Sequence, residues 1–262
     1  MISCESSYND IPKPFYVKIN RFELKNDSSL GIEDAWVDVN GEFVGVFEVP
    51  VVFPVVSEKE AIISISPGVK VNGVNTTRTY YPFYKTYRQN IDISLTDTIE
   101  ILPQTSYIDE TVVCWYEGFE SGHKFEKSNN SDTSFIITYN DKFKGISSGV
   151  VYLDSKKTFF ESYTPKLSVS KFNSLLGAFL ELNYKCNINF DIGLYIYSKG
   201  HITLLNLVSI YSSNVWKKIY IDLYTPLLKF EKDTFYSIYI TAKHNEVSSK
   251  SFIFIDEFKV IQ

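Results

Sequence analysis

The chain has 262 residues, of which 44% are hydrophobic and 22% charged, so it is globular and long enough for two β domains. Its net charge of −5 is spread along the sequence without a block of lysine and arginine, which excludes a nucleic-acid-binding function. No apolar run reaches the roughly 18 residues of a membrane-spanning helix. Aromatic residues make up 16%, and this favours strands.

The N-terminus predicts a lipid anchor. Met1-Ile2-Ser3-Cys4 resembles the end of a bacterial lipobox, whose cysteine is acylated, and residues 1–13 form a polar tether. The charged and apolar parts of a signal peptide are missing, so either the start lies upstream or the written sequence is nearly mature. We expect Cys4 to attach the protein to an outer membrane. The alternative is a cytoplasmic protein that happens to begin with these residues.

Residues 14–103 predict a small β-sandwich. Asn40-Gly41 lies between two alternating apolar runs and predicts a tight hairpin turn. Pro67-Gly68 and Asn72-Gly73 predict two further turns. The stretch 75–88, NTTRTYYPFYKTYR, alternates poorly, so we expect a long hairpin or loop whose Tyr80, Tyr81 and Tyr84 form an interface patch.

Residues 104–262 predict a larger two-sheet jelly roll with long alternating strands. One apolar face runs through Ala178, Leu180, Leu182 and Tyr184, and the next strand continues with residues 188–196. The remaining predicted core faces contain these residues: Ile219, Ile221, Leu223, Tyr236, Ile238, Ile240 and Ala242. The expected fold class is therefore all-β, with a small sandwich followed by a jelly roll.

Short motifs of both regions resemble those of Bacteroidota cell-envelope lipoproteins. The second region is similar to jelly rolls of the carbohydrate-binding-module and MAM type. The shared stretches are GFESG (118–122), SSGVVYL (147–153), AFLELNYK (178–185), WKKIYIDL (216–223) and FIDEFKV (254–260). The first region resembles Ig-like or PEGA-like β domains, through DAWVDVNGEFVGVFEVP. The resemblance implies a fold and a location rather than an activity.

The resemblance also implies one structural calcium ion. In calcium-bearing jelly rolls of this type, an early glutamate and a last-strand aspartate help to hold the ion, and the matching residues are Glu120 and Asp256. Hard oxygen ligands suit calcium. The alternative is that both carboxylates bind backbone amides.

No catalytic constellation is present, so we expect a protein that is not an enzyme. The three histidines share no ligand spacing, and no hydrolase, P-loop or dinucleotide motif occurs. Cys114 and Cys186 are either bridged or two unpaired buried thiols, and we favour unpaired thiols.

Tyrosines predict a binding surface. Asp191, Gly193, Tyr195 and Tyr197 lie opposite the apolar face of their strand, with Tyr220 and Tyr239 on comparable faces of later strands. Such rings stack on sugars and also contact proteins. We therefore expect a non-catalytic lipoprotein subunit of an outer-membrane protein complex, for secretion, β-barrel assembly or uptake. The alternative is a glycan-binding surface lipoprotein.

Overall fold

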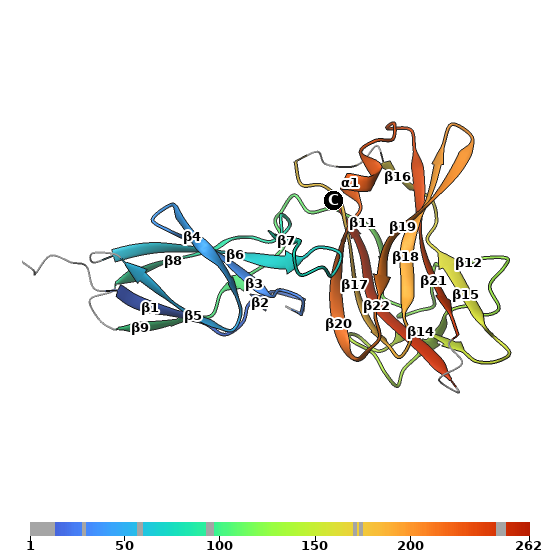
Figure 1. The fold of residues 1–262 in the computed structure, drawn as a ribbon, viewed down its shortest axis with the longest axis horizontal. Helices are drawn as coiled ribbons and strands as arrows, with labels where there is room; N and C mark the ends of the chain where they lie inside the picture. The colour runs from blue at the N-terminus through green and yellow to red at the C-terminus, as the bar shows by residue number, and fades with distance from the viewer. Residues whose placement is uncertain are drawn as a thin grey trace, which may run out of the picture. The chain divides into compact units, whose positions relative to one another are not determined.

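The computed structural model describes residues 14–27, 30–56, 60–92, 97–169, 172, 175–244 and 250–262 (Figure 1). The chain forms two compact units, one of Met1–Val69 with Arg78–Asp109 and one of Lys70–Thr77 with Glu110–Gln262. The predicted tether with Cys4 lies outside the described residues. Within the described part of the chain, no helix is long and apolar enough to cross a membrane.

The first unit is built from short strands in two main sheets. The strands are β1 (Pro14–Ile19), β2 (Glu23–Leu24), β3 (Asp34–Val39), β4 (Glu42–Glu48), β5 (Val51–Val56), β6 (Glu60–Lys70), β7 (Arg78–Tyr80), β8 (Tyr87–Asp92), β9 (Thr98–Ile101) and β10 (Gln104–Thr105). One sheet has the order β5-β1-β9, and the other has the order β4-β3-β6-β7 with β8 also on β6. Alternate residues of β1, β5 and the first half of β6 are buried, as a sandwich requires.

Two of the three turns predicted in residues 14–103 are confirmed, although the second of them, at Asn72-Gly73, belongs to the second unit. Asn40 and Gly41 both have positive φ angles, 54° and 85°, between β3 and β4. Asn72 and Gly73 also have positive φ angles. The prediction of a turn at Pro67-Gly68 is wrong, because β6 continues through both residues. Gly68 instead provides space, since a Cβ there would lie 2.7 Å from Trp36 Nε1.

The first unit ends at Asp109, whereas the sequence places the boundary at residue 103. The short strand β10 pairs in parallel with β2, so residues 104 and 105 belong to the first unit. A two-residue strand has no alternation pattern, and only its pairing reveals it.

The second unit contains two six-stranded sheets. Its strands are β11 (Val113–Glu117), β12 (Glu126–Lys127), β13 (Ile136–Thr138), β14 (Ser148–Leu153), β15 (Phe159–Tyr163), β16 (Leu167–Ser168), β17 (Phe179–Cys186), β18 (Phe190–Ser198), β19 (His201–Ile210), β20 (Ser213–Asp222), β21 (Phe235–Lys243) and β22 (Ser251–Ile261). The β22 sheet has the order β13-β14-β22-β17-β20, with β11 on β22. The β18 sheet has the order β12-β15-β21-β18-β19, with β16 on β21. All strand pairs in both sheets are antiparallel, and one short helix, α1 (Tyr224–Leu227), follows β20. These features confirm the predicted all-β fold.

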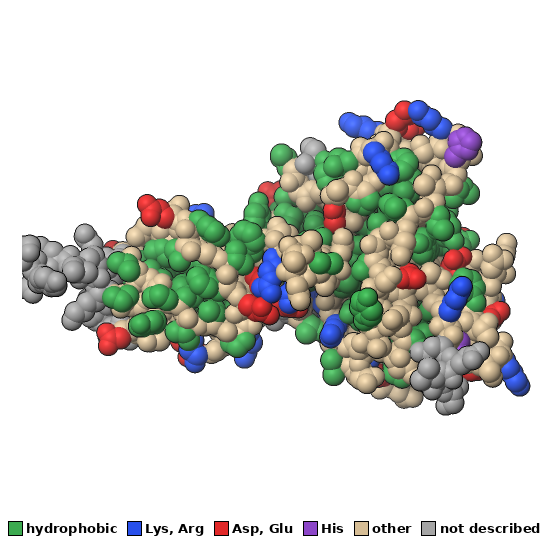
Figure 2. Space-filling model, in the orientation of Figure 1, with side chains coloured by type: hydrophobic (Ala, Val, Ile, Leu, Met, Phe, Trp, Pro, Cys, Tyr) green, Lys and Arg blue, Asp and Glu red, His purple; other side chains and the backbone are tan. Residues whose placement is uncertain are grey.

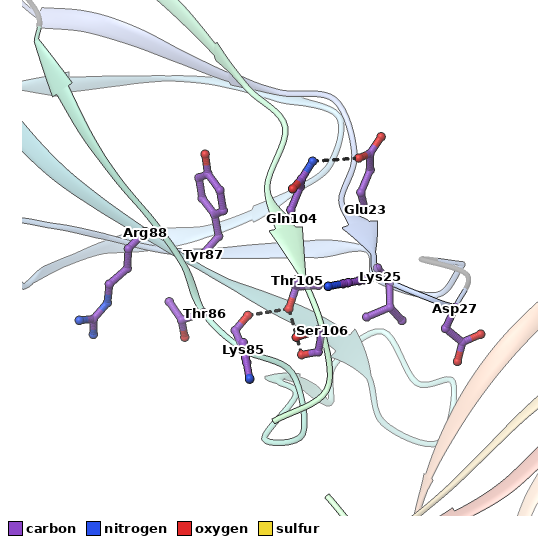
Figure 3. Close-up of a pocket in the computed structure, with 11 residues that line it drawn as sticks. Glu23, Lys25, Asp27, Lys85, Thr86, Tyr87, Arg88, Gln104, Thr105 and Ser106 are labelled. Carbon is purple, nitrogen blue, oxygen red and sulfur yellow. Dashed lines mark hydrogen bonds between the residues drawn. The ribbon is translucent and has the colours of Figure 1, made fainter. Parts of the chain in front are cut away.

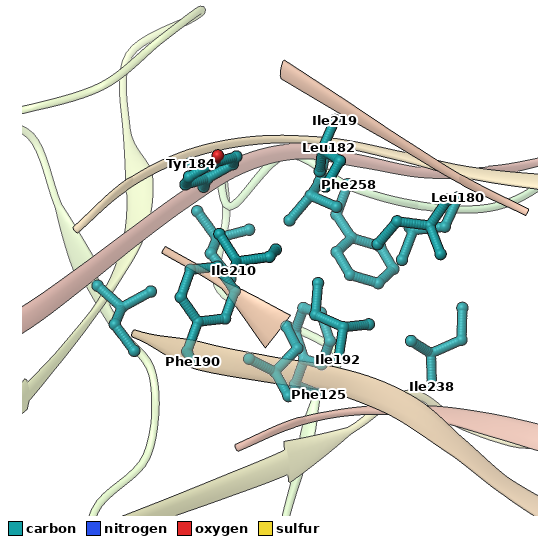
Figure 4. Packing of buried hydrophobic residues seen from close by; sticks show 14 of the residues in the cluster. Phe125, Leu180, Leu182, Tyr184, Phe190, Ile192, Ile210, Ile219, Ile238 and Phe258 are labelled. Carbon is teal, nitrogen blue, oxygen red and sulfur yellow. The ribbon is translucent and has the colours of Figure 1, made fainter. Parts of the chain in front are cut away.

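The core of the second unit lies between its two sheets (Figure 4). Leu180 and Leu182 of β17 face Ile192 of β18 and Ile238 of β21 across it. Every apolar face predicted for these strands is buried in this cluster. Because alternation is strict, the other side chains of β18 and β21 must point away from the core. They form the surface described next.

Candidate functional site

The outer surface of the β18 sheet is lined with tyrosines. Tyr195 and Tyr197 come from β18, Tyr163 from β15 and Tyr239 from β21. Tyr239 of β21 pairs with Gly193 of β18 on one side and with Tyr163 of β15 on the other. Directly paired residues share a face of a sheet. We call this surface the tyrosine face, made of Glu161, Tyr163, Asp191, Tyr195, Tyr197, Tyr239 and Thr241.

Gly193 allows the ring of Tyr239 to lie flat on the sheet. A Cβ at this glycine would be 2.3 Å from Tyr239 Cζ and Oη, and 2.3 Å from the carbonyl oxygen of Leu205. The ring therefore crosses β18 at the one position without a side chain, and it is 4% exposed. It forms the floor of the face, on which the Tyr195 ring packs with centroids 5.1 Å apart.

Tyr195 is held in one orientation from two sides. Its hydroxyl donates to Glu161 Oε1 over 2.9 Å, and Tyr163 packs edge-on against its ring at 5.8 Å. Burial, followed by the hydrogen bond to Glu161, raises the pKa of Tyr195 above its usual range. The hydroxyl therefore stays protonated and remains a donor at physiological pH.

The two ends of the tyrosine face differ in chemistry. At one end, Asp191 accepts a hydrogen bond from the hydroxyl of Ser209, and it lies beside Thr241 in the register. At the other end, the ammonium group of Lys166 lies 4.2 Å from the centroid of the Tyr197 ring. The face thus combines aromatic rings with carboxylate acceptors, which together can stack on a sugar and accept its hydroxyl hydrogens.

The structure brings together the predicted residues Asp191, Gly193, Tyr195, Tyr197 and Tyr239. Glu161 and Tyr163 were missed, although the alternation of FFESY in β15 places them on the side opposite buried Phe160. Only strand pairing shows that β15 lies beside β21. Tyr220 is not part of this face, because β20 belongs to the β22 sheet and its ring is buried.

The predicted patch of Tyr80, Tyr81 and Tyr84 is corrected by the structure. Tyr81 and Tyr84 are only 1% and 4% exposed, and their rings pack together at 4.7 Å. Neither side chain can therefore form part of an interface with another molecule. Tyr80 is exposed and packs on Trp36, which also contacts exposed Phe43.

Glu120 and Asp256 both bind one loop, residues 143–146. Asp256 Oδ2 accepts the backbone N–H groups of Phe143 and Lys144, at 2.9 and 3.0 Å. Both carboxylate oxygens of Glu120 accept the N–H of Ile146. In the described part of the chain, no group of three His, Cys, Asp or Glu side chains could hold a metal. Backbone N–H groups thus bind both carboxylates, as the alternative describes, and the calcium ion stays a prediction.

No disulfide joins Cys114 to Cys186, as the sequence analysis favoured, but only Cys186 is buried and Cys114 is half-buried. Cys186 lies in the core of the second unit, where burial raises its pKa to about 11. A thiol of that kind is inert and acts as a small apolar side chain.

The first unit has a hollow of about 890 Å³ that the sequence analysis did not predict (Figure 3). It lies beside β2, β10 and the start of β8, and its charged lining residues are Glu23, Lys25, Asp27, Lys85 and Arg88. Several of its polar groups already form hydrogen bonds or ion pairs within the protein. Thr105 Oγ1 donates to the Lys85 carbonyl, Gln104 donates to Glu23, and the Lys85 ammonium pairs with Asp109. The mixed charges favour no single class of ligand.

No family model and no curated protein matches this chain.

Solved structures similar to part of it include three carbohydrate-binding modules. The CBM22-1 xylan-binding domain of Paenibacillus barcinonensis Xyn10C is 11% identical, with 57% of this chain and 93% of that one covered and a TM-score of 0.38. TmCBM61 in complex with β-1,4-galactotriose is 15% identical, with coverages of 55% and 92% and a TM-score of 0.35. The family 11 module of Clostridium thermocellum in complex with a β-1,3-1,4-mixed-linked tetrasaccharide is 13% identical, with coverages of 55% and 92% and a TM-score of 0.39. Because these TM-scores are below 0.5, we base the function on the geometry of the tyrosine face.

Proposed function

We propose that this protein is a non-catalytic glycan-binding protein and that the tyrosine face is its binding site. The observation that carries the proposal is the fixed Tyr195 ring, held between Glu161 and Tyr163 above the flat ring of Tyr239. A ring fixed before binding loses little conformational entropy when a sugar stacks on it. The carboxylates of Glu161 and Asp191 supply the acceptors that give orientation and specificity.

The charge of the face selects neutral glycans. Glu161 and Asp191 place two acidic side chains on this face, and a uronic acid or sulfate group beside them would be repelled. Lys166 lies at the opposite end, on Tyr197. We expect binding to xylan, β-1,4-galactan or mixed-linked β-glucan over polygalacturonate or a sulfated glycan.

Affinity electrophoresis with this panel, followed by calorimetry on the best oligosaccharide, tests the proposal. Tyr195→Ala should weaken binding at least about tenfold, because it removes the central ring. Glu161→Gln keeps the shape of the side chain and should give a smaller loss. Tyr152→Ala is the matched control, since Tyr152 is a half-buried tyrosine of β14 in the β22 sheet with Lys250 over its ring. Equal affinity of Tyr195→Ala and the wild type would refute the assignment.

A second function, as a subunit of an outer-membrane protein complex, is supported by the exposed aromatic side chains of the first unit. Phe43 and Tyr80 flank Trp36 with ring centroids 6.0 and 5.9 Å away. Trp, Tyr and Phe are enriched at the centres of protein interfaces. Purification from membranes in mild detergent should yield a co-eluting partner that is lost in Phe43→Ser/Tyr80→Ser and kept in Val52→Ser. Val52 is an exposed residue of the other sheet. If the wild type elutes without a partner, the proposed role as a complex subunit is refuted.

A further inference from the structure

Exposed apolar side chains gather at one end of the second unit. At this end β18 stops and β19 and β21 begin. Ile202 and Leu204 of β19 are 67% and 63% exposed, and Phe235 of β21 is also exposed. The register places Ile202 and Phe235 on either side of Tyr197, so these three side chains form one row.

The connection from α1 to β21 lies at the same end of the unit. It carries exposed Leu228, and a 2.6 Å ion pair between Lys199 and Glu231 ties it to the β18–β19 turn. We call Ile202, Leu204, Leu228 and Phe235 the apolar tip. The side chains of the apolar tip offer no hydrogen bonds to sugar hydroxyls, which favours a ligand different from that of the tyrosine face. Contiguous exposed apolar surface of this kind marks an interaction site.

Lysines surround the apolar tip. Lys166, Lys199, Lys229 and Lys232 are exposed in the turns and connections of this end, against the two exposed acids Glu231 and Asp233. Figure 2 shows blue lysine or arginine and purple histidine side chains together at the upper end of this unit. The excess of positive charge attracts an anionic surface.

We propose that the apolar tip docks on the surface of an anionic phospholipid membrane. The aliphatic side chains enter the boundary between headgroups and acyl chains, and lysine ammonium groups contact the phosphates. Long lysine stems can cover apolar surface while their charges stay in water. Tyr197 suits the same boundary, because its ring is apolar and its hydroxyl is polar. The apolar tip adjoins the proposed glycan site, because Tyr197 belongs to the tyrosine face and Leu204 pairs with Tyr195, and vesicle binding without sugar tests the tip separately.

Vesicle co-sedimentation of the full chain tests this inference. All samples carry Cys4→Ala, so that an acyl chain cannot contribute. The vesicles contain phosphatidylcholine alone or a 3:1 mixture with phosphatidylglycerol, and no sugar. We expect binding to the mixed vesicles, weaker binding to phosphatidylcholine, and release by high salt as the charges are screened.

Ile202→Ser/Leu204→Ser should lower the partition coefficient for mixed vesicles at least tenfold. Lys229→Gln/Lys232→Gln should lower it and reduce its salt dependence. Val215→Ser is the matched control, because Val215 of β20 is equally exposed and lies outside the tip, and it should bind as the parent does. An unchanged thermal melt shows that each variant is folded.

Two results would overturn the proposal. One is the absence of binding to mixed vesicles by the parent protein, or equal binding by the parent and the Ile202→Ser/Leu204→Ser variant. The other is a concentration-dependent dimer that the serine substitutions abolish while vesicle binding does not change, since the tip would then contact a second copy of the chain.

Discussion

Asp256 shows how one buried side chain can organise a loop. Its carboxylate has no exposed surface and accepts three backbone N–H groups, from Phe143, Lys144 and Glu257. Burial raises its pKa to about 6, and these three hydrogen bonds oppose the rise. A carboxyl group that gains a proton more readily in the folded state makes stability depend on pH.

The sign of this dependence follows from the two pKa values. The folded-state pKa of about 6 lies above the value of about 3.9 for an unfolded aspartate, so protonation favours the folded state. The contribution is complete below about pH 4 and is lost as the pH rises through about 6. Its size is on the order of 2–3 kcal/mol.

Asp256→Asn should remove this contribution. Between pH 4 and pH 7 the difference in unfolding free energy between wild type and variant should shift in favour of the variant, because only the wild type ionises there. Urea unfolding followed by circular dichroism at several pH values measures it. Parallel curves for the two proteins would contradict the raised pKa.

The calcium prediction at the same residues stays a prediction, and it can be tested by melting temperature. The loop amides already bind the oxygens of Glu120 and Asp256, so we expect equal melting temperatures in calcium and in a chelator. A ligand that binds only the folded state would raise the melting temperature by mass action. A calcium-dependent rise that Glu120→Gln abolishes would support the structural ion and would require the loop to move.

At the scale of single elements, β18 assembles the candidate site because its two faces differ. Phe190, Ile192, Leu194 and Ile196 point into the core, and the alternate side chains build the tyrosine face. The strand pairs on both sides, with β19 and β21, so its backbone is held in place by two neighbours. A defect in β18 should therefore affect packing and binding together.

Gly193→Ala tests this coupling. The added Cβ would meet the Tyr239 ring and the Leu205 carbonyl at 2.3 Å, so we expect a loss of about 1–3 kcal/mol in stability and weaker glycan binding. Gly200→Ala in the β18–β19 turn is the comparison. It meets no atom within 4 Å, but its φ of 78° makes it cost about 1 kcal/mol without affecting binding. Chemical denaturation and calorimetry measure both effects, and an unperturbed Gly193→Ala protein would disprove the tight packing.

For the whole molecule, the prediction of a lipid anchor at Cys4 stays a prediction, since that residue lies outside the described part of the chain. One acyl chain gives only marginal membrane binding, whereas an acyl chain combined with a second signal gives stable attachment. The apolar tip is our proposal for such a second signal.

Fractionation of cells expressing the wild type, Cys4→Ala, and Cys4→Ala with the two serine substitutions at the tip separates these contributions. We expect the wild type in the membrane fraction, partial release of Cys4→Ala in high salt, and full release of the combined variant. Unchanged membrane association of the combined variant would contradict both the anchor and the tip.

Local pattern in the sequence was sufficient to predict the all-β class, the Asn40-Gly41 turn and the core faces of β17, β18, β20 and β21. The reason is physical, because alternation and turn chemistry are properties of neighbouring residues. The same rule predicted that Tyr195 and Tyr197 point away from the core. Alternation did not predict the burial of Tyr81 and Tyr84, because their stretch lacks an alternating pattern and burial there depends on distant packing. Only the tertiary structure placed Glu161 and Tyr163 beside Tyr195, Tyr220 in the opposite sheet, and the amides of 143–146 on Asp256. Those contacts join residues far apart in the chain, and strand order, which no local pattern encodes, decides them.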